Sequence, residues 1–475
     1  MSLPVISLVG RPNVGKSTLF NRLTRSRDAL VADEPGLTRD RKYGKIHCDG
    51  HRLLVVDTGG IGEVSTAIDQ LVSEQTTLAI EESDVIFFIV DAQAGVMPGD
   101  GLIASVLRKG AKRVYLLVNK AEGRNEELAK ADFFALGMGE PLAISATHGW
   151  QVQDVMEEVL KDLGLLAIEP PDFEREVPAS QEKKIVIAGR PNVGKSTLVN
   201  ALLGEERVLA SETPGTTRDS IEIPFNYHSK TYILIDTAGV RRKGKVTETV
   251  EKFSAIKALQ AIETAHIIVF LLDATEGITE QDASLLGYIH DTGKALVIGV
   301  NKSEDLGFNQ QNLFKDEIAY RLHFVSYARI VMISALQLQG LDKLMSAVDQ
   351  SLKSAYLDVS TTVLTELLAQ ALQQHQPPLI RGRRIKLRYA HQGGKNPLRI
   401  IIHGNQTQSV MLTYARFLVG FFRESLGLVG TSLKLEFKSS VNPFAGRRNE
   451  LSPRQQKRRT RIVKHAKKSR RKSKN

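Results

Sequence analysis

The chain has 475 residues, of which 42% are hydrophobic and 25% are charged, a composition typical of a globular protein long enough for about three domains. Its one cysteine, Cys48, excludes an intramolecular disulfide and fits a reducing compartment. The net charge of +11 is uneven, because residues 1–354 carry 39 basic and 48 acidic side chains, residues 355–450 carry 13 and 5, and residues 451–475 carry 12 and none, which indicates a polyanionic partner for the last third.

Strand and helix patterns alternate over residues 1–167, which we predict to be one domain. Strands are predicted near 3–9, 43–49, 52–57, 84–91, 113–119 and 141–145, and helices near 16–24, 66–81, 99–109, 125–136 and 151–164. This alternation predicts an α/β fold with a mostly parallel sheet, helices on both faces and one hairpin turn at Asp49-Gly50. The first strand starts near Val5 and no apolar run approaches a membrane span, so we expect no leader peptide and a cytoplasmic protein.

The same pattern returns over residues 183–354, after a linker at 168–182 with three prolines and four glutamates. The eight letters Gly-Arg-Pro-Asn-Val-Gly-Lys-Ser occur at 10–17 and again at 189–196, an offset of 179 residues. Later motifs repeat at offsets of 182 and 189 residues, and such small increments are what loop insertions in a duplicated domain would produce. The sequence therefore predicts two tandem domains and no short solenoid repeat.

The remaining chain changes character. Residues 355–440 predict a small α+β domain with a helix near 359–374, strands at 385–391 and 398–403, a helix near 410–426 and a strand near 433–438. Residues 441–475 are poor in apolar side chains and dense in arginine and lysine, so we predict a basic, disordered tail.

The repeated eight residues have the spacing of a phosphate-binding loop, and each copy stands between a β-branched run and an apolar-periodic helix pattern. Glycines let successive backbone N–H groups face an anion, and the following helix adds its dipole. Lys16 and Lys195 are predicted to reach the β- and γ-phosphates, and Ser17 and Ser196 to hold Mg²⁺. The predicted loop residues are Gly10, Arg11, Pro12, Asn13, Val14, Gly15, Lys16 and Ser17, and Gly189, Arg190, Pro191, Asn192, Val193, Gly194, Lys195 and Ser196.

Two further motifs predict a switch that senses the γ-phosphate. Thr38 and Thr217, in repeated Pro-Gly-x-Thr loops, are predicted to bind Mg²⁺ and the γ-phosphate. A carboxylate at Asp57 or Asp236 would orient a metal-bound water, and the N–H of Gly60 or Gly239 would bond the γ-phosphate, so that its loss releases both loops. The complete second motif is Asp57, Thr58, Gly59, Gly60 and Ile61, and Asp236, Thr237, Ala238, Gly239 and Val240.

A third motif predicts a guanine site. Asn119 and Asn301 are predicted at the purine N7 edge, Lys120 and Lys302 along the ring, and the backbone amides of two alanines at guanine O6. The predicted residues are Asn119, Lys120, Ala121, Glu122, Ser145 and Ala146, and Asn301, Lys302, Ser303, Glu304, Ser334 and Ala335. Together with the phosphate loops these motifs predict a GTP/GDP and Mg²⁺ protein that hydrolyses GTP.

Tandem copies of this set, followed by a small basic α+β domain and a cationic tail, resemble the Der (EngA) family of ribosome biogenesis GTPases over essentially the whole chain. The resemblance implies a bacterial GTPase that acts in biogenesis of the large (50S) ribosomal subunit. It also implies a KH-like third domain, nucleotide-dependent rearrangement of the two GTPase domains, and partners that are the large subunit and ribosomal RNA. We expect a monomer with no DNA or membrane partner.

The chain departs from the family pattern at the base. The family places an aspartate two residues after the Asn-Lys pair to bind guanine N1–H and N2–H₂, whereas this chain has Glu122 and Glu304. Glutamate keeps the charge and both oxygens but adds one methylene, so a bidentate pair is still expected. The alternative is relaxed base choice, and Asp305 is a second candidate one residue out of register.

Hydrolysis raises a further point. Many GTPases orient the attacking water with a glutamine where this chain has Ile61 and Val240, so we expect slow intrinsic turnover. Asn13 and Asn192 match the asparagine with which potassium-activated relatives hold K⁺, and an ion there would supply charge beside the phosphates. The alternative is that both asparagines only brace the loop. Arg39 and Arg218 are either fingers in cis or solvated side chains.

The basic end predicts RNA binding through phosphates. The twelve tail cations are joined by a cluster at the first strand of the third domain, Arg381, Arg383, Arg384, Lys386 and Arg388. A tail that binds any polyanion is the alternative. In the third domain Gly393-Gly394-Lys395-Asn396 is a strand turn and does not fit the Gly-x-x-Gly clamp of typical KH domains, which makes a protein-facing surface a rival there. For the whole chain, the rival functions are a metabolic phosphotransferase and a scaffold with one catalytically silent nucleotide domain.

Overall fold

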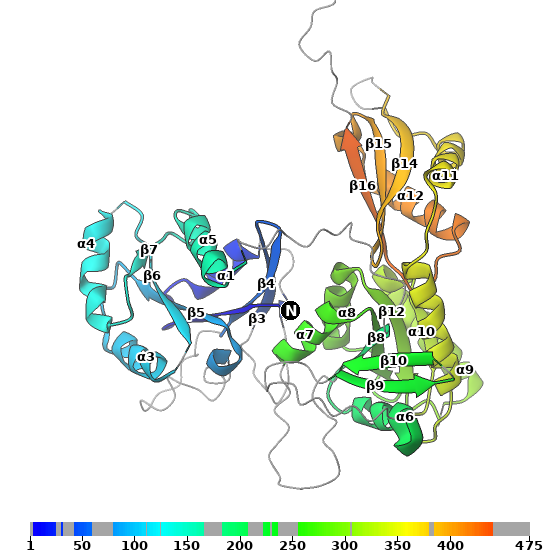
Figure 1. Ribbon diagram of the computed structural model, residues 1–475, viewed down its shortest axis with the longest axis horizontal. Coiled ribbons are helices and arrows are strands. Elements are labelled where there is room, and N and C mark those ends of the chain that lie inside the picture. Colours follow the sequence, from blue (N-terminus) through cyan, green and yellow to red (C-terminus); the bar gives the residue numbers. More distant parts are fainter. Residues whose placement is uncertain are drawn as a thin grey trace, which may run out of the picture.

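Three sheets organise the protein (Figure 1). The computed structural model describes residues 3–24, 30–31, 42–58, 79–110, 112–123, 125–165, 183–207, 222–228, 230–235, 255–304, 306–379 and 384–439. The predicted linker and basic tail lie outside the described residues, as do most of the predicted helix at 66–81 and both switch threonines.

The first unit is a seven-stranded sheet with the order β2-β3-β4-β1-β5-β6-β7. Its elements are β1 (Val5–Val9), α1 (Lys16–Leu23), β2 (Leu30–Val31), β3 (Lys42–Cys48), β4 (His51–Asp57), β5 (Val85–Asp91), α3 (Pro98–Lys109), β6 (Arg113–Asn119), α4 (Glu126–Ala131), a 3₁₀ turn (Asp132–Leu136), β7 (Leu142–Ala143) and α5 (Val152–Asp162). The pairing is parallel except at β2–β3 and β3–β4, which confirms the predicted hairpin. The two-residue strand β2 was not predicted, because so short a run has no readable period.

Burial explains the sequence pattern of this sheet. Every residue of β5 is buried, since helices cover both faces of a parallel sheet and leave no solvent-facing positions. One face packs Leu8 and Val55 against Phe20 of α1, and the other packs Phe88 and Leu116. The central strands thus end at a common edge, where their carboxyl-terminal residues meet.

The second unit repeats this topology, with the strand order β13-β12-β11-β8-β10-β9. Its elements are β8 (Lys183–Ala188), α6 (Lys195–Arg207), β9 (Glu222–Tyr227), β10 (Lys230–Ile235), α7 (Ala255–Thr264), β11 (Ile267–Asp273), α8 (Glu280–Thr292), β12 (Ala295–Asn301), α9 (Phe308–Arg321), a 3₁₀ turn (His323–Val325), β13 (Arg329–Met332) and α10 (Leu341–Ala355). Strand β8 pairs in parallel with β10 and β11, as β1 does with β4 and β5. The predicted duplication is therefore confirmed.

The third unit has the predicted order α-β-β-α-β. It comprises α11 (Thr361–Gln374), β14 (Lys386–Gly394), β15 (Leu398–Asn405), a 3₁₀ turn (Thr407–Ser409), α12 (Leu412–Ser425) and β16 (Leu433–Ser439). Its sheet pairs β14 with β15 antiparallel and β15 with β16 parallel. The core joins Leu368 and Phe422 of the helices to Ile402 of the sheet, with Phe417 and Phe421 packed against it.

The first and second units share a hydrophobic cluster. Tyr43, Leu54 and Val56, from the β3–β4 hairpin, belong to the same cluster of buried residues as Ile262 and Ala265 at the end of α7. The apolar surface of the hairpin is therefore buried against the second unit, which stabilises the contact roughly in proportion to area.

One buried carboxylate marks the centre of this contact. Glu263 of α7 lies 2.8 Å from Lys45 and 3.4 Å from Arg52 of the hairpin, and it accepts a hydrogen bond of 3.2 Å from the Tyr288 hydroxyl. Burial alone would raise the pKa of Glu263, but the two cations outweigh it and hold that pKa below its usual value.

The third unit docks on the second through the β14–β15 turn. Asn396 donates to the carbonyl of His266 at 2.7 Å and accepts from the N–H of Ala295 at 3.1 Å. Lys434 donates to the carbonyl of Asp291 at 3.0 Å. In Figure 1 the upper ends of β14, β15 and β16 point away from the second unit.

Candidate nucleotide-binding sites

Each phosphate loop makes a turn that only glycine tolerates. Gly15 and Gly194 have φ of +100° and +95°, and a Cβ on either would lie 2.2 Å from the side-chain nitrogen of Asn119 or Asn301. The loops therefore curl tightly at the start of α1 and α6, leaving helix N–H groups directed at the space in front. This is the cradle that the repeated sequence predicted.

The loop lysines hold their own loops closed. Lys16 donates to the carbonyls of Gly10 and Arg11 at 2.8 and 2.7 Å, and Lys195 donates to those of Gly189 and Arg190 at 3.0 and 2.5 Å. Burial lowers the pKa of Lys16 to about 8, because desolvation disfavours the ammonium form. A phosphate oxygen would supply the negative charge that this buried lysine lacks.

A hydroxyl and a carboxylate meet where Mg²⁺ was predicted in the first unit. Ser17 donates to Asp57 at 2.8 Å, and Asp57 is 1% exposed. Hard oxygen ligands of this kind, completed by phosphates and water, suit Mg²⁺. The part of the chain that the structure describes holds no group of three or more His, Cys, Asp or Glu able to bind a metal. The donor set therefore fits a nucleotide-bound Mg²⁺.

Among the remaining residues predicted for the two switch motifs, Thr58 is described by the structure and most of the others are not. Thr58 donates to the carbonyl of Leu8 at 2.8 Å, so its hydroxyl braces β1. Lying outside the described residues are Thr38, Arg39, Gly59, Gly60, Ile61, Thr217, Arg218, Asp236, Thr237, Ala238, Gly239 and Val240.

The two predicted purine-binding asparagines have the same geometry. Asn119 donates to the carbonyl of Val14 at 2.8 Å and accepts from the N–H of Ala146 at 2.9 Å. Asn301 makes the matching bonds to Val193 and Ala335 at 2.8 and 2.9 Å. Each side chain thus ties the phosphate loop to the guanine loop, and its amide retains one further N–H for a purine N7.

The guanine loops are closed by their serines. Ser145 and Ser334 each accept a backbone hydrogen bond from the residue three positions on, at 3.2 and 3.1 Å. Upstream, the N–H of Ala121 donates to Ile144 at 3.2 Å and the hydroxyl of Ser303 to Ile333 at 2.8 Å. The Asn-Lys segment and the Ser-Ala segment are therefore locked together in both units.

Two aspartates that are not among the predicted site residues position the predicted lysines. Lys120 donates to Asp91 at 2.7 Å and to the carbonyl of Asn13 at 2.9 Å, and Lys302 forms an ion pair with Asp273. Burial alone would raise the pKa of Asp91. The charge of Lys120 and the hydrogen bonds to the carboxylate together outweigh burial, so this pKa lies below its usual value. The available signal was position, since both aspartates end a fully buried parallel strand.

A second pair was also missed. Arg11 donates to the fully buried Asp100 of α3 at 2.7 Å, and Arg190 lies 2.9 Å from the fully buried Asp282 of α8. Arg190 has a further partner, Glu276 at 2.8 Å, whereas one guanidinium nitrogen of Arg11 is buried without a hydrogen bond to any described residue. These arginines fix each phosphate loop on the helix beside it.

The glutamates that replace the family aspartate differ in environment. Glu122 is exposed, whereas Glu304 is partly buried and its Oε2 atom has no hydrogen-bond partner among the described residues. A buried, unpaired carboxylate oxygen is costly, so it needs a donor from a ligand. The N1–H and N2–H₂ groups of guanine are donors of the required kind, and Glu304 therefore fits a guanine base.

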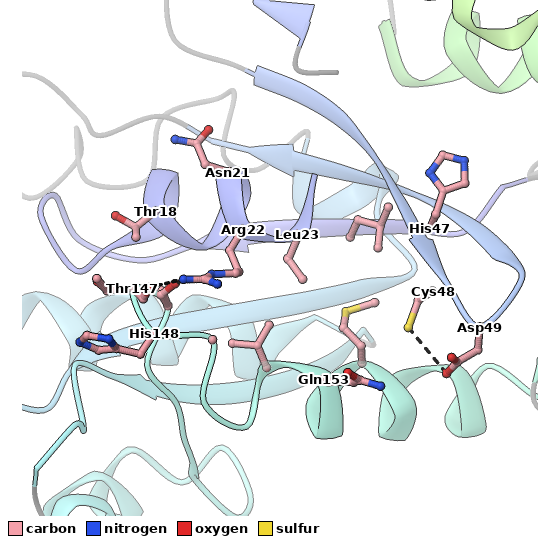
Figure 2. A pocket seen from close by; sticks show the side chains of 15 residues that line it. Thr18, Asn21, Arg22, Leu23, His47, Cys48, Asp49, Thr147, His148 and Gln153 are labelled. Atoms are coloured by element: carbon pink, nitrogen blue, oxygen red, sulfur yellow. Dashed lines mark hydrogen bonds between the residues drawn. The ribbon is translucent and has the colours of Figure 1, made fainter. Parts of the chain in front are cut away.

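A cavity of about 850 Å³ lies beside the first guanine loop, between α1, the β3–β4 hairpin and α5. Figure 2 shows Arg22 directed at Thr147, and it donates to the carbonyl of Ala146 at 3.1 Å. His148 and Cys48 also line the cavity. His148 thus lies beside the guanine loop in the wall of this cavity, and Arg22 fixes the loop from behind.

Two sequence-family profiles match the chain. One is described as a 50S ribosome-binding GTPase and matches residues 5–120 and 184–302. The other is described as the KH-domain-like C-terminal domain of EngA bacterial GTPase enzymes and matches residues 359–438.

Full-length relatives decide the family. GTPase Der of Thioalkalivibrio sulfidiphilus is 52% identical over 470 residues, which cover 98% of this chain and 100% of the relative. This chain belongs to the Der (EngA) GTPase family. GTPase Der of Sodalis glossinidius is 49% identical over 486 residues, with 98% and 100% of the two chains covered.

Among solved structures, a variant of Aquifex aeolicus Era bound to GDP.AlF4- matches 55% of this chain and 94% of its own, at 24% identity and a TM-score of 0.28. A likeness this weak supports no statement about function. Membership in the Der family makes the chain a GTP-binding switch protein that hydrolyses GTP, with two P-loop GTPase domains and a KH-like domain. No helix in the described ranges is long and apolar enough to cross a bilayer.

Proposed function

We propose that this Der-family GTPase drives a step in biogenesis of the large (50S) ribosomal subunit, binding ribosomal RNA–protein particles in the bacterial cytoplasm in a nucleotide-dependent way. The observation that carries the proposal is the union of two GTP sites with a basic KH-like unit in one chain. Residues 384–439 hold nine basic and two acidic side chains, a charge balance suited to RNA. The matching family profile, described as a 50S ribosome-binding GTPase, supports the same proposal.

We assign the chain to five segments on this basis. They are a first GTPase domain (1–167), a linker (168–182), a second GTPase domain (183–354), a KH-like domain (355–440) and a basic tail (441–475). The described elements of each sheet fall within these limits.

The proposed catalytic set follows from the loops. Lys16 and Lys195 would exchange their loop carbonyls for phosphate oxygens, since both ammonium groups already lie inside the curl. Ser17 and Asp57 would hold Mg²⁺ together with Thr38, and Ser196 would do so with Asp236 and Thr217. When bound, Mg²⁺ neutralises charge on the β- and γ-phosphates. The N–H groups of Gly60 and Gly239 are assigned to the γ-phosphate.

A potassium ion is proposed beside Asn13 and Asn192. Both residues have left-handed backbones, with φ of 65° and 63°, at exposed tips of the loops. The backbone carbonyl of Asn13 is held by Lys120, so its side-chain amide is the group left for an ion. Because Ile61 and Val240 cannot polarise water, we expect GTP turnover to be several-fold faster in KCl than in NaCl. Equal rates in both salts, or an unchanged ratio in Asn13→Ala and Asn192→Ala, would contradict the potassium assignment.

The test of the ribosomal role is co-sedimentation of the full chain with purified 50S subunits under a non-hydrolysable GTP analogue, GDP or no nucleotide. We expect association with the analogue and little with GDP. Lys16→Met and Lys195→Met, tested separately, show which site controls association. Equal pelleting under all three conditions would refute the nucleotide-dependent role, and pelleting with 30S alone would refute the large-subunit assignment.

The second candidate function is a scaffold with one silent nucleotide domain. The difference between the two guanine loops favours it. Glu122 is exposed whereas Glu304 has a buried orphaned oxygen. Single-turnover GTP hydrolysis in the two lysine variants separates the cases. A silent domain requires that one variant retain all hydrolysis and the other none.

A further inference from the structure

The outer face of the KH-like sheet carries a cluster of rings. Its inner face, with Leu387, Ile400 and Ile402, packs against α11 and α12. Strand register places Tyr389 opposite His403 on the other face, and His403 opposite Lys438. His391 is two residues beyond Tyr389 on β14 and so shares that face. We call Tyr389, His391 and His403 the ring patch.

The rings of this patch are nearly parallel. The centroids of Tyr389 and His403 lie 4.5 Å apart with an interplanar angle of 5°, and those of His391 and His403 lie 5.1 Å apart at 25°. The Nε2 atom of His403 is buried with no hydrogen bond to the described residues, so stacking holds this ring in place. Tyr389 is 43% exposed and forms the open side of the stack.

The pKa of His403 lies below its usual value, which favours the neutral imidazole. Burial lowers its pKa, and the neighbouring His391 and Lys438 lower it further. A neutral imidazole stacked on a phenol presents an aromatic surface without the hydration shell of a cation. The ring patch therefore resembles the aromatic platforms on which nucleic-acid bases stack.

Cations surround the ring patch on its free sides. Lys438 stands in the same row of the sheet, and Lys386 and Arg388 are exposed on β14 nearby. At the opposite end of the sheet the charges are already engaged, because Arg399 pairs with Glu436 at 3.4 Å and Lys434 donates to Asp291 of the second GTPase domain. Among the described residues, the cations Lys386, Arg388 and Lys438 have no ion pair with an acidic side chain, and they lie at the end of the sheet that points away from the second GTPase domain (Figure 1).

We propose that the ring patch is a stacking site for single-stranded RNA. Bases would stack on the rings of the ring patch. The flanking phosphates would be neutralised by the cations Lys386, Arg388 and Lys438. Single strands fit because only unstacked bases can leave their helix for an aromatic side chain. This mode does not depend on a Gly-x-x-Gly clamp. The proposal rests on the proposed ribosomal function in one respect, which is that RNA is the partner.

The experiment uses the full chain and a twelve-nucleotide oligoadenylate that contains one 2-aminopurine, in excess inorganic polyphosphate to compete with purely electrostatic binding. Tyr389→Thr/His403→Thr removes the rings and keeps good strand formers. We expect binding to weaken by about fivefold or more, since one stacked base contributes about 1–3 kcal/mol, and the stacking-induced quenching of 2-aminopurine to disappear. Tyr389→Phe/His403→Phe keeps two rings and should retain both signals.

Charge is tested with a matched pair. Lys438→Ala, beside the ring patch, should weaken binding and reduce the salt slope of log affinity by about 0.7, as for one phosphate contact on a single strand. Arg416→Ala removes an exposed cation from α12, on the helical side of the domain, and should leave both unchanged. Circular-dichroism melting of every variant verifies the fold.

Several outcomes would overturn the proposal. Unchanged oligoadenylate affinity in Tyr389→Thr/His403→Thr would do so, as would equal weakening in the Phe variant. If Tyr389→Thr/His403→Thr leaves RNA binding unchanged but abolishes co-sedimentation with 50S subunits, the ring patch contacts a protein instead. Failure of the wild-type chain to co-sediment with 50S subunits refutes the ribosomal function alone, because the oligonucleotide measurement is independent of it.

Discussion

The two GTPase domains place the same atoms at the phosphates and at the purine-binding asparagines, but they differ in the residues around the rest of the guanine loop. At the phosphates, Lys16 and Lys195 bond the same two carbonyls of their loops, and Gly15 and Gly194 differ by 5° in φ. The phosphate half depends on backbone shape, which only a narrow set of sequences can adopt. Its geometry is therefore the same in both copies.

The base half differs between the copies. Arg22 fastens the first guanine loop, whereas the equivalent position of the second domain is Ala201. The turn after the first loop uses Gly149 at φ +79°, and the second uses Leu338 at +58°, a conformation that costs a leucine energy. Glu122 and Glu304 differ in burial as well. The two copies therefore share the phosphate loop and its asparagine, and they differ in the supports of the guanine loop.

The largest expected effect tests the shared half. Asn119→Ala and Asn301→Ala each leave a buried carbonyl and a buried N–H unpaired, which costs about 1–3 kcal/mol per group. We expect the free energy of unfolding of the affected domain to fall by about 3 kcal/mol and its nucleotide binding to be lost. Denaturant titration and fluorescent GDP binding measure both. A loss confined to one of the two variants would break the equivalence of the domains.

The second prediction concerns pH and the first domain. The pKa of Lys16 is lowered to about 8 in the nucleotide-free protein, so above pH 8 the folded state binds fewer protons than the unfolded one and its stability rises with pH. Bound phosphate requires the ammonium form, so nucleotide affinity should change in the opposite sense and fall about fivefold between pH 8 and pH 9. Calorimetry measures the proton uptake that accompanies nucleotide binding to the first domain, in a Lys195→Met background that disables the second site. The uptake should vanish in Lys16→Met, and its persistence there would assign it to another group.

The third prediction separates the two guanine loops. Glu304→Gln removes the charge from a carboxylate with a buried orphaned oxygen, and a hydrogen bond to a charged group contributes about 1.5–3 kcal/mol. We expect GDP affinity of the second domain to fall about tenfold or more. Glu122→Gln should cost less, because that side chain is exposed and screened. Equal losses in the two variants would remove the distinction drawn between the loops.

The fourth prediction concerns backbone strain. Leu338→Gly relieves a left-handed leucine whose side chain is 62% exposed. The gain of about 1–2 kcal/mol exceeds the entropy that glycine loses on folding, so thermal unfolding should show a net stabilisation of about 0.5–1 kcal/mol. Gly149→Ala in the first domain is the reciprocal control and should destabilise. A neutral result at both positions would mean that the loop relaxes freely.

The smallest expected effect concerns the partners of Arg11 and Arg190. Ala94 occupies the position that corresponds to Glu276, the extra partner of Arg190. Ala94→Glu should give Arg11 an equivalent partner and raise the free energy of unfolding by about 0.5 kcal/mol, because partly exposed pairs contribute little. High salt should abolish the gain. A gain that persists at 1 M salt would point to packing as its source.

The sequence predicted most of the fold because its signals are local. The phosphate loops, the alternating elements and the α-β-β-α-β order follow from periodicity and motif spacing within short windows, and the hairpin follows from Asp49-Gly50. The chain's membership in the Der family agrees with the predicted resemblance. The roles of the switch residues outside the described ranges stay predictions.

What the sequence could not show depends on contacts between distant residues. Arg11 meets Asp100 across 89 positions, and Glu263 meets Arg52 across 211. No spacing rule connects such residues before the sheets are assembled. The ring patch was hidden for a different reason, because a bulge between Leu387 and Tyr389 shifts the alternation of β14. Inward and outward positions cannot be counted through such a bulge from sequence alone.

The contact at Glu263 also distinguishes the two hairpins. It is a head-to-tail arrangement, in which the hairpin of one domain seats on α7 of the next, and arrangements of this type extend into filaments unless something ends them. In the second hairpin the positions that correspond to Tyr43, Lys45 and Arg52 are Glu222, Pro224 and Thr231. That hairpin lacks both cations that bind the carboxylate and the apolar ring beside them. The second hairpin therefore does not carry the side chains that make this contact in the first.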